Sequence, residues 1–353
     1  MNSGLKNFFP MIREKQDVLK RIHKNKKLKA LFENWNKTQQ EEFLNIVTGM
    51  KGVKILYDSF FKEIMNPEYN PERLEKFLTL LLGRKVKILR VLPNDSTRIA
   101  DETSLLIMDI VVELEDGSIA NIEVQKIGYY FPGQRSACYS ADLLLRQYKR
   151  VRSEKQQTFH YKDIKNVYTI VFFEQSPTQF KDFPKLYRHF FEQKSDTGLE
   201  LDLLQKYLFV PLDIFKKNLH NKGISSELDA WLTFLSVDEP SYIIELIEEY
   251  PEFKPMYEEI YQMCLNMEKV MEMFSQELQK LDQNTVQYMI DIMQDTIDEQ
   301  KEQLDQKQQE ITQGILNAIN IMKELNVPEN EILKKLQEKY LLTLEQAEEY
   351  LKH

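Results

Sequence analysis

Two acidic side chains, Asp109 and Glu123, lie in an apolar stretch from Ile107 to Gln125 that contains an Asp-Gly turn near its middle. Apolar and polar residues that alternate on both sides of such a turn are typical of a β-hairpin. Carboxylates on paired strands lie close together, and oxygen ligands of this kind favour Mg²⁺ or Mn²⁺. A metal held there would activate water and neutralise charge on a phosphate, which is the chemistry of phosphodiester hydrolysis.

The length of the turn decides whether the two carboxylates meet. A two-residue loop, Asp116-Gly117, places Asp109 opposite Val124, whereas a three-residue loop starting at Glu115 places Asp109 opposite Glu123. We prefer the second register because it gathers the apolar side chains on one face. That face carries Met108, Ile110, Val112, Leu114, Ala120, Ile122 and Val124. The other face carries Asp109, Val111, Glu113, Asn121, Glu123 and Gln125.

In this register the Cβ atoms of the two acidic residues are roughly 5 Å apart. Two carboxylates so close repel each other unless a cation lies between them. An acidic hairpin face in solvent would show the same residues, so the pattern alone leaves both interpretations open.

The order Asp109, hairpin, then Glu123-Val124-Gln125 resembles the PD-(D/E)xK nuclease superfamily. More narrowly, it resembles the recombination-promoting nuclease and putative transposase family, in which Gln commonly replaces the last Lys. Further segments match that family in the same order: Asp58 to Ile64, the helix with Arg135, Tyr139 and Gln147, the apolar run Val167 to Phe173, and Leu228 to Leu235. The resemblance covers residues 57–237.

The resemblance implies an α/β (α+β) restriction-endonuclease-like fold, a central mixed sheet flanked by helices. It also implies a DNA endonuclease that uses Mg²⁺ (or Mn²⁺ or Ca²⁺) and is linked to recombination, mobile elements or defence against foreign DNA. Asp109 and Glu123 would be the metal ligands, with Asp58 a further candidate ligand, and Gln125 would orient the attacking water. The residues that would contact DNA or support the site are Lys62, Arg135, Tyr139 and Gln147.

Gln125 carries no charge and cannot stabilise developing negative charge as a lysine does, so activity would be slow or need a second basic group. Lys126 is adjacent, but it should point to the opposite face of an extended strand. A catalytically weak or inactive DNA-binding or assembly protein is therefore the alternative function, and a strand-transfer transposase is a third. The alternative role of Asp58 is a helix cap, and that of Arg135, Tyr139 and Gln147 is a buried polar network.

Strands are predicted at 86–92, 107–114, 119–124, 167–173 and 204–211, with helices between them. Helices also dominate residues 1–57, where Thr38 to Glu41 reads as a capping box for a helix that stops near Gly49. After Pro240 the strand signals disappear. We therefore expect a basic helical N-terminal extension at 1–56, a nuclease-like core at 57–239, and an acidic, partly coiled-coil helical region at 240–353.

The formal net charge is −9, but its sign changes along the chain. Residues 1–57 hold twelve basic and five acidic side chains, whereas residues 240–353 hold ten basic and twenty-four acidic ones. The basic stretch 20–29 would contact phosphates or remain a solvated helix face, and both interpretations stay open.

Apolar residues of the C-terminal region follow coiled-coil spacing. They are Met267, Met271, Phe274, Leu278 and Leu281, then Ile290, Ile297, Leu304 and Ile311. A homodimer through these helices is one prediction, and a helical hairpin packed on its own core is the other.

Several classes of protein are not expected. Two cysteines and five scattered histidines offer neither a disulfide framework nor a zinc site. No phosphate-binding glycine loop occurs, so no nucleotide cofactor is expected. No apolar run reaches the roughly 20 residues that span a bilayer, so we expect a cytoplasmic protein without a membrane partner.

Overall fold

The computed structural model describes residues 4–93, 109–126 and 132–352. It divides into two compact units, residues 1–286 and 287–353, which are considered separately here. The first unit contains the sheet and every residue of the predicted active site.

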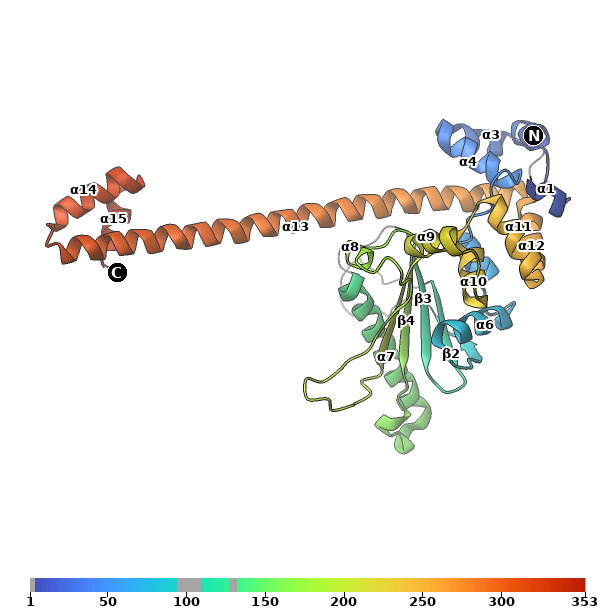
Figure 1. Ribbon diagram of the computed structural model, residues 1–353, viewed down its shortest axis with the longest axis horizontal. Coiled ribbons are helices and arrows are strands. Elements are labelled where there is room, and N and C mark those ends of the chain that lie inside the picture. The colour runs from blue at the N-terminus through green and yellow to red at the C-terminus, as the bar shows by residue number, and fades with distance from the viewer. Residues whose placement is uncertain (1–3, 94–108, 127–131, 353) are drawn as a thin grey trace. The chain divides into compact units, whose positions relative to one another are not determined.

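A six-stranded mixed sheet forms the centre of the first unit, in the order β1-β2-β3-β4-β6-β5 (Figure 1). The strands are β1 Ile88–Val91, β2 Ile110–Leu114, β3 Ile119–Gln125, β4 Val167–Phe173, β5 His189–Phe191 and β6 Gln205–Pro211. Strands β3, β4 and β6 are parallel to one another, and the remaining pairs are antiparallel. Parallel neighbours need a long crossover, and α7 Pro132–Lys155 lies in the crossover between β3 and β4. The predicted mixed sheet with flanking helices is confirmed.

The β2-β3 hairpin has the three-residue turn. Ile110 pairs with Ile122 and Val112 with Ala120, and the amide of Leu114 donates to the carbonyl of Ser118 at 2.8 Å. Gly117 has a φ of +83°, in the left-handed region where a side chain is strained. The register preferred from the hydrophobic pattern is therefore confirmed, and the alternative with the shorter turn is excluded.

Both faces of this hairpin are buried. Val112, Ala120 and Ile122 join the main core. There, Phe172 of β4 stacks on Phe77 of α6 (Pro71–Leu82), and Phe77 stacks on Trp231 of α10 (Glu227–Ser236). On the opposite face, Val111 and Ile119 pack with Tyr139 and Leu143 of α7. Figure 1 shows α7 on the side of the sheet away from α6 and α10.

The helices of the first unit come in three groups. The N-terminal group is α1 Gly4–Phe8, α2 Lys15–Lys24, α3 Lys26–Glu33 and α4 Lys37–Val47. The core group, besides α7, is α5 Asp58–Ile64, α6 Pro71–Leu82, α8 Thr178–Lys181, α9 Leu212–Lys222 and α10 Glu227–Ser236, with 3-10 turns at Gln156–Thr158 and Tyr161–Asp163. The last group is α11 Pro240–Glu249, a 3-10 turn at Pro251–Phe253, α12 Lys254–Cys264 and the first part of α13 Met267–Glu324.

Two local predictions differ from the structure. The capping box of α4 uses Asn36 and Gln39, not Thr38 and Glu41, because the Asn36 side chain accepts the amide of Gln39 at 2.9 Å. Strand β5 was not predicted, since three residues are too few to show a periodic pattern.

The N-terminal helices pack on the start of α13. The ring of Phe274 lies 5.0 Å from that of Trp35 and 5.5 Å from that of Phe43. Lys27 of the basic stretch pairs with Glu268 at 2.7 Å and with Glu272 at 3.1 Å. Part of the predicted basic surface is thus neutralised by the acidic region of the same chain.

The second unit is a small helical cluster. The end of α13 packs through Ile315 and Ile319 against Ile332 and Leu336 of α14 Glu329–Tyr340, and α15 Leu344–Lys352 adds Ala347. Within the described part of the chain, no helix combines the length and apolar character needed to cross a membrane.

Candidate active site

The two predicted carboxylates meet at the open end of the hairpin. Asp109 lies just before β2, and its backbone N–H donates to Glu123 Oε1 at 3.3 Å. The N–H of Val124 donates to Asp109 Oδ2 at 2.8 Å. Each carboxylate therefore accepts a backbone hydrogen bond from the opposite side of the hairpin, just beyond the last paired residues, Ile110 and Ile122. This exchange fixes both side chains across the end of the hairpin.

Glu123 is a destabilised anion in this position. Its side chain is buried, and burial raises its pKa well above the ordinary value, as does the charge of Asp109. Asn121 and Arg135 act in the opposite direction, but they do not cancel the shift. A carboxylate so placed is ionised most readily when a cation binds beside it.

A lysine from another element already approaches the pair. Lys62 Nζ of α5 lies 3.2 Å from Asp109 Oδ1, the oxygen that does not accept the Val124 amide. A pocket of about 450 Å³ opens beside this contact, and Lys62, Asn66, Glu68 and Asp109 contribute polar groups to its lining. The pocket leaves open space beside the charged end of the hairpin.

Gln125 shares the face of Glu123 and is buried. Its Oε1 has no hydrogen-bond partner among the residues that the structure describes. Leaving a buried acceptor without a partner costs about 1–3 kcal/mol. This oxygen can therefore accept a hydrogen bond from water or bind a cation.

The metal-binding potential is that of an oxygen site. No group of three or more His, Cys, Asp or Glu side chains suited to a metal occurs among residues 4–93, 109–126 and 132–352. Asp109 and Glu123 supply carboxylate oxygens, and Gln125 adds an amide oxygen. Because Mg²⁺ binds through one or two carboxylates and keeps several waters, these donors fit Mg²⁺ or Mn²⁺. The side chain of Asp58, the third candidate ligand, lies outside the described residues.

The next lysine in the chain, Lys126, is engaged elsewhere. Its ammonium forms a buried ion pair with Glu277 of α13 and lies 4.4 Å from the ring centre of Tyr57. Tyr57 is the residue before α5, and its hydroxyl donates to Glu42 at 2.9 Å. The end of β3 and the start of α5 are therefore held by a common buried network. Sequence reasoning missed Glu277 because it lies far from Lys126 along the chain.

The three candidate residues of α7 separate into two groups. Arg135 lies near enough to Glu123 to lower its pKa, and its guanidinium is 5.3 Å from the ring centre of the buried Tyr139. Gln147 lies at the other end of the hairpin, where it accepts the amide of Lys165 at 2.6 Å and donates to the carbonyl of Gly117 at 3.5 Å. Arg135 thus lies near Glu123 and over the ring of Tyr139, whereas Gln147 stabilises the turn.

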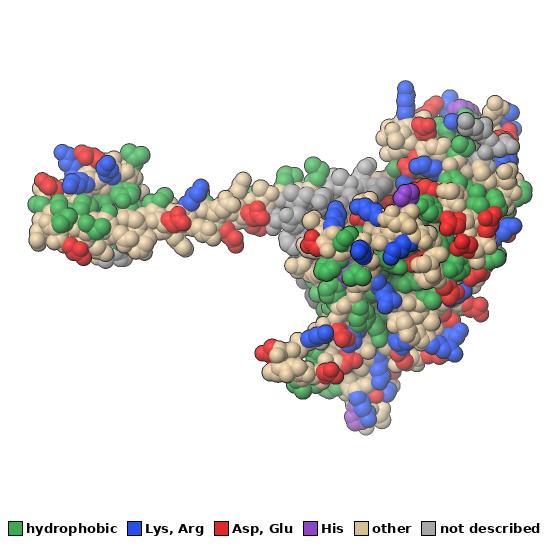
Figure 2. Space-filling view, in the orientation of Figure 1, with side chains coloured by type: hydrophobic (Ala, Val, Ile, Leu, Met, Phe, Trp, Pro, Cys, Tyr) green, Lys and Arg blue, Asp and Glu red, His purple; other side chains and the backbone are tan. Residues whose placement is uncertain are grey.

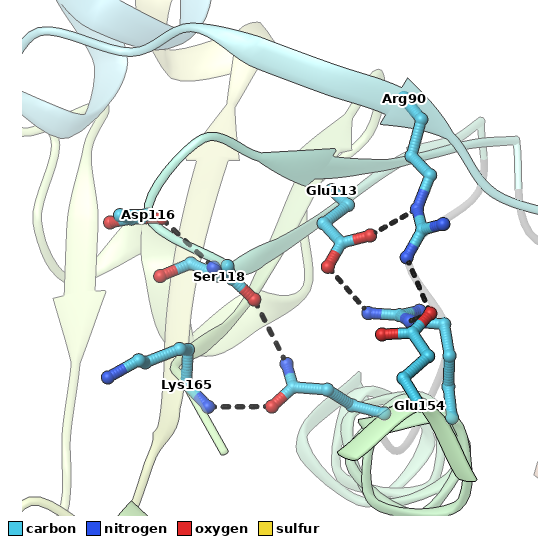
Figure 3. A network of polar contacts seen from close by, with 9 residues as sticks. Arg90, Glu113, Asp116, Ser118, Glu154 and Lys165 are labelled. Carbon is cyan, nitrogen blue, oxygen red and sulfur yellow. Dashed lines mark hydrogen bonds and ion pairs between the residues drawn. The ribbon is translucent and has the colours of Figure 1, made fainter. Parts of the chain in front are cut away.

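A second set of ion pairs also stabilises the turn end (Figure 3). Glu113, on the polar face of β2, accepts from Arg90 of β1 and from Arg150 of α7. Arg90 also contacts Glu154 at 3.2 Å. These contacts connect β1, β2 and α7. The carboxylate of Glu113 is therefore engaged in ion pairs near the turn and is not part of the candidate active site.

A mixed sheet with an acidic pair on a central hairpin, followed by a crossover helix, defines a restriction-endonuclease-like nuclease fold. The family model described as PD-(D/E)XK nuclease family transposase matches residues 55–289, and the chain belongs to this family. Neither the curated proteins nor the solved structures yield a match to the chain.

Proposed function

We propose that this protein is a divalent-metal-dependent DNA endonuclease that hydrolyses phosphodiester bonds. The observation that carries the proposal is the Asp109 and Glu123 pair, fixed across the end of the hairpin and open to a pocket on the Asp109 side. The family, described as a nuclease family transposase, supports a link to mobile elements. A link to recombination or to defence against foreign DNA is part of the same proposal.

Asp109 and Glu123 would hold Mg²⁺ or Mn²⁺, which when bound supplies activated water and neutralises charge on the phosphate. The role of Gln125 is to orient the water through its amide, because its Oε1 is otherwise without a partner among the described residues. Arg135 lies close enough to Glu123 to lower the pKa of that carboxyl, in opposition to burial and to the charge of Asp109. Lys62 supplies the positive charge that Gln125 lacks, since its ammonium already lies at the Asp109 oxygen that does not accept the Val124 amide.

The direct test is nicking of supercoiled plasmid DNA by the purified full-length chain. The reactions contain Mg²⁺, Mn²⁺ or Ca²⁺, with EDTA as the negative control. Conversion to open circles in Mg²⁺ or Mn²⁺ and its suppression by EDTA are expected. Intact plasmid at all protein concentrations and with all three metals would reject the proposal.

Lys62→Gln is expected to slow nicking by about 100- to 1,000-fold, because removing one charge-stabilising donor costs roughly 2.7–4 kcal/mol. Lys62→Arg should keep much of the activity, since the charge remains. Lys76→Gln is the matched control, as Lys76 is an exposed lysine of α6 that pairs with Glu227 and Glu252. Equal nicking rates in Lys62→Gln and Lys76→Gln would remove Lys62 from the mechanism.

A non-cleaving DNA-binding or assembly protein is the second candidate, and the uncharged Gln125 favours it. It predicts salt-dependent DNA binding that Glu123→Gln leaves unchanged, together with no cleavage by the wild type. Cleavage by the purified wild-type chain would exclude it, and joined DNA products would point to strand transfer instead.

We further propose that residues 57–239 are the catalytic core, flanked by the N-terminal extension and the acidic C-terminal region. We also propose a homodimer through α13. In support, Ile297, Leu304 and Ile311 recur every seven residues, and their side chains are exposed. Repeating apolar residues on an exposed helix face are the contact surface of coiled coils.

Leu304→Glu is expected to convert the dimer to a monomer, because it places a charge in the middle of that stripe. Molar mass from light scattering during size-exclusion chromatography measures the result. Asp305→Lys, on the neighbouring position, is the control. A monomeric wild type, or a Leu304→Glu variant that stays dimeric, would contradict the dimer through α13.

A further inference from the structure

Three aromatic rings cluster where α7 ends. The ring of Tyr148 stacks on that of Tyr161 at 6.2 Å and 11°, and Phe159 packs edge-on against both. Tyr161 is 78% exposed. One exposed ring is ordinary on a protein surface, but an exposed ring supported by two others offers a flat apolar face in a fixed orientation.

Basic side chains surround these rings. Residues 146–165 contain seven Lys and Arg and two acidic residues, in a chain whose formal net charge is −9. Both acidic residues are paired: Glu154 with Arg90 and Asp163 with Lys155. Figure 2 shows Lys and Arg side chains gathered at the edge of the core unit where α7 ends in Figure 1.

Three of these cations remain available for a ligand. Lys149 and Lys162 form no ion pair with any residue that the structure describes, and both are exposed. The Arg152 guanidinium lies over the ring of Tyr148, 5.6 Å from its centre. We call Tyr148, Lys149, Arg152, Phe159, Tyr161 and Lys162 the α7 tip.

Helix α7 connects the α7 tip to the candidate active site. Arg135, near its start, approaches Glu123, and Arg152 lies 17 residues further on, about 26 Å along the helix axis at 1.5 Å per residue. Between Gly133 and Arg152, the exposed side chains of α7 include no carboxylate. A negatively charged strand that follows this face from the active site to the α7 tip therefore meets no acidic side chain of the helix.

We propose that the α7 tip binds single-stranded nucleic acid beside the cleavage site, with a base stacked on Tyr161 and phosphates contacting Lys149, Arg152 and Lys162. Stacking requires an exposed base face, which single strands offer and a base-paired duplex hides. The location relative to cleavage rests on the proposed nuclease function, whereas the binding itself does not.

The test is fluorescence anisotropy with a labelled 20-nucleotide single strand and with a duplex of equal length. Full-length protein carrying Glu123→Gln is used in EDTA, so that cleavage does not contribute. Tyr161→Ala is expected to weaken single-strand binding about 5- to 100-fold, as loss of one base stack does, and to change duplex binding little. Tyr161→Phe should restore binding, because it retains the ring. Lys162→Gln should reduce the salt slope for the single strand by about 0.7.

Phe190→Ala is the control, since Phe190 is an exposed ring of the edge strand β5 that is 51% exposed. Unchanged single-strand binding in Tyr161→Ala overturns the inference, as does an equal loss for single strand and duplex. If the wild type fails to nick plasmid while the Tyr161 effect is observed, the nuclease proposal falls and this inference stands. If the wild type nicks plasmid and Tyr161→Ala binds the single strand normally, this inference falls alone.

Discussion

Asp109→Asn and Glu123→Gln should each slow metal-dependent nicking by at least about 1,000-fold, or about 4 kcal/mol of activation free energy. Both substitutions remove a charged oxygen ligand and keep the shape of the side chain. An asparagine oxygen at position 109 can still accept the amide of Val124, now at 2.8 Å from Oδ2. The loss should therefore reflect missing charge and not a rearranged hairpin.

The same Glu123→Gln variant should be more stable than the wild type when metal is absent. The pKa of Glu123 is raised in the folded protein, so ionising this group costs stability above its unfolded pKa, and the cost grows as pH rises through the folded pKa. Below the unfolded pKa the carboxyl is neutral in both states and the cost disappears. The Tm difference between variant and wild type should thus be larger at pH 8 than at pH 4.

Glu192→Gln serves as the control for both measurements, because Glu192 is an exposed acid paired with Lys206 at 3.1 Å. It should alter neither nicking nor the Tm appreciably. Nicking by Glu123→Gln at the wild-type rate would contradict the metal-binding role of the pair. A Glu123→Gln variant that is less stable than the wild type at pH 8 would contradict the cost of ionising Glu123 in the folded protein.

The second large effect concerns the buried pair of Lys126 and Glu277. Glu277→Gln should lower the free energy of unfolding by about 3–5 kcal/mol, because it leaves the Lys126 ammonium buried without its counter-charge. The two side chains are 7% and 1% exposed, so water cannot replace the lost partner. Denaturation by urea, followed by circular dichroism, measures the change.

Two comparisons separate the pair from a general loss of packing. The double variant Lys126→Met with Glu277→Leu should recover most of the stability, since neither charge then remains buried. Glu63→Gln breaks the partly exposed pair with Lys269 and should cost less than about 1 kcal/mol. A double variant as unstable as Glu277→Gln would show that shape, not charge, sets the effect.

The hairpin was largely predictable from sequence because a strand has a strict period of two residues. Burial of Ile110, Val112 and Ile122 on one face leaves a single register, and that register alone brings Asp109 and Glu123 together. The apolar run Val167–Phe173 was equally clear, since a strand covered on both faces needs no polar residue.

Contacts between distant segments were not predictable in this way. Nothing in the local pattern around Lys126 indicates Glu277, and nothing around Glu113 indicates Arg90 and Arg150. Gln147 lies eight residues after Tyr139 on α7 and is buried like it, but this spacing gives no sign of how far along the hairpin Gln147 lies. The periodicity of apolar residues predicts which side chains share a face of a helix or strand. Which charged side chains form ion pairs depends on how those elements pack in the folded chain.

The turn at Gly117 has a genetic consequence. Any missense change of a glycine codon introduces a Cβ, and here that atom would lie 3.1 Å from the side chain of Lys165 on a backbone with φ of +83°. Random mutagenesis with selection for activity should therefore find this codon nearly invariant, although glycine has no side chain that could take part in catalysis. A substitution at Gly117 would therefore reduce activity as an active-site substitution does. The altered turn would shift the register of the hairpin, so that Asp109 and Glu123 no longer share a face.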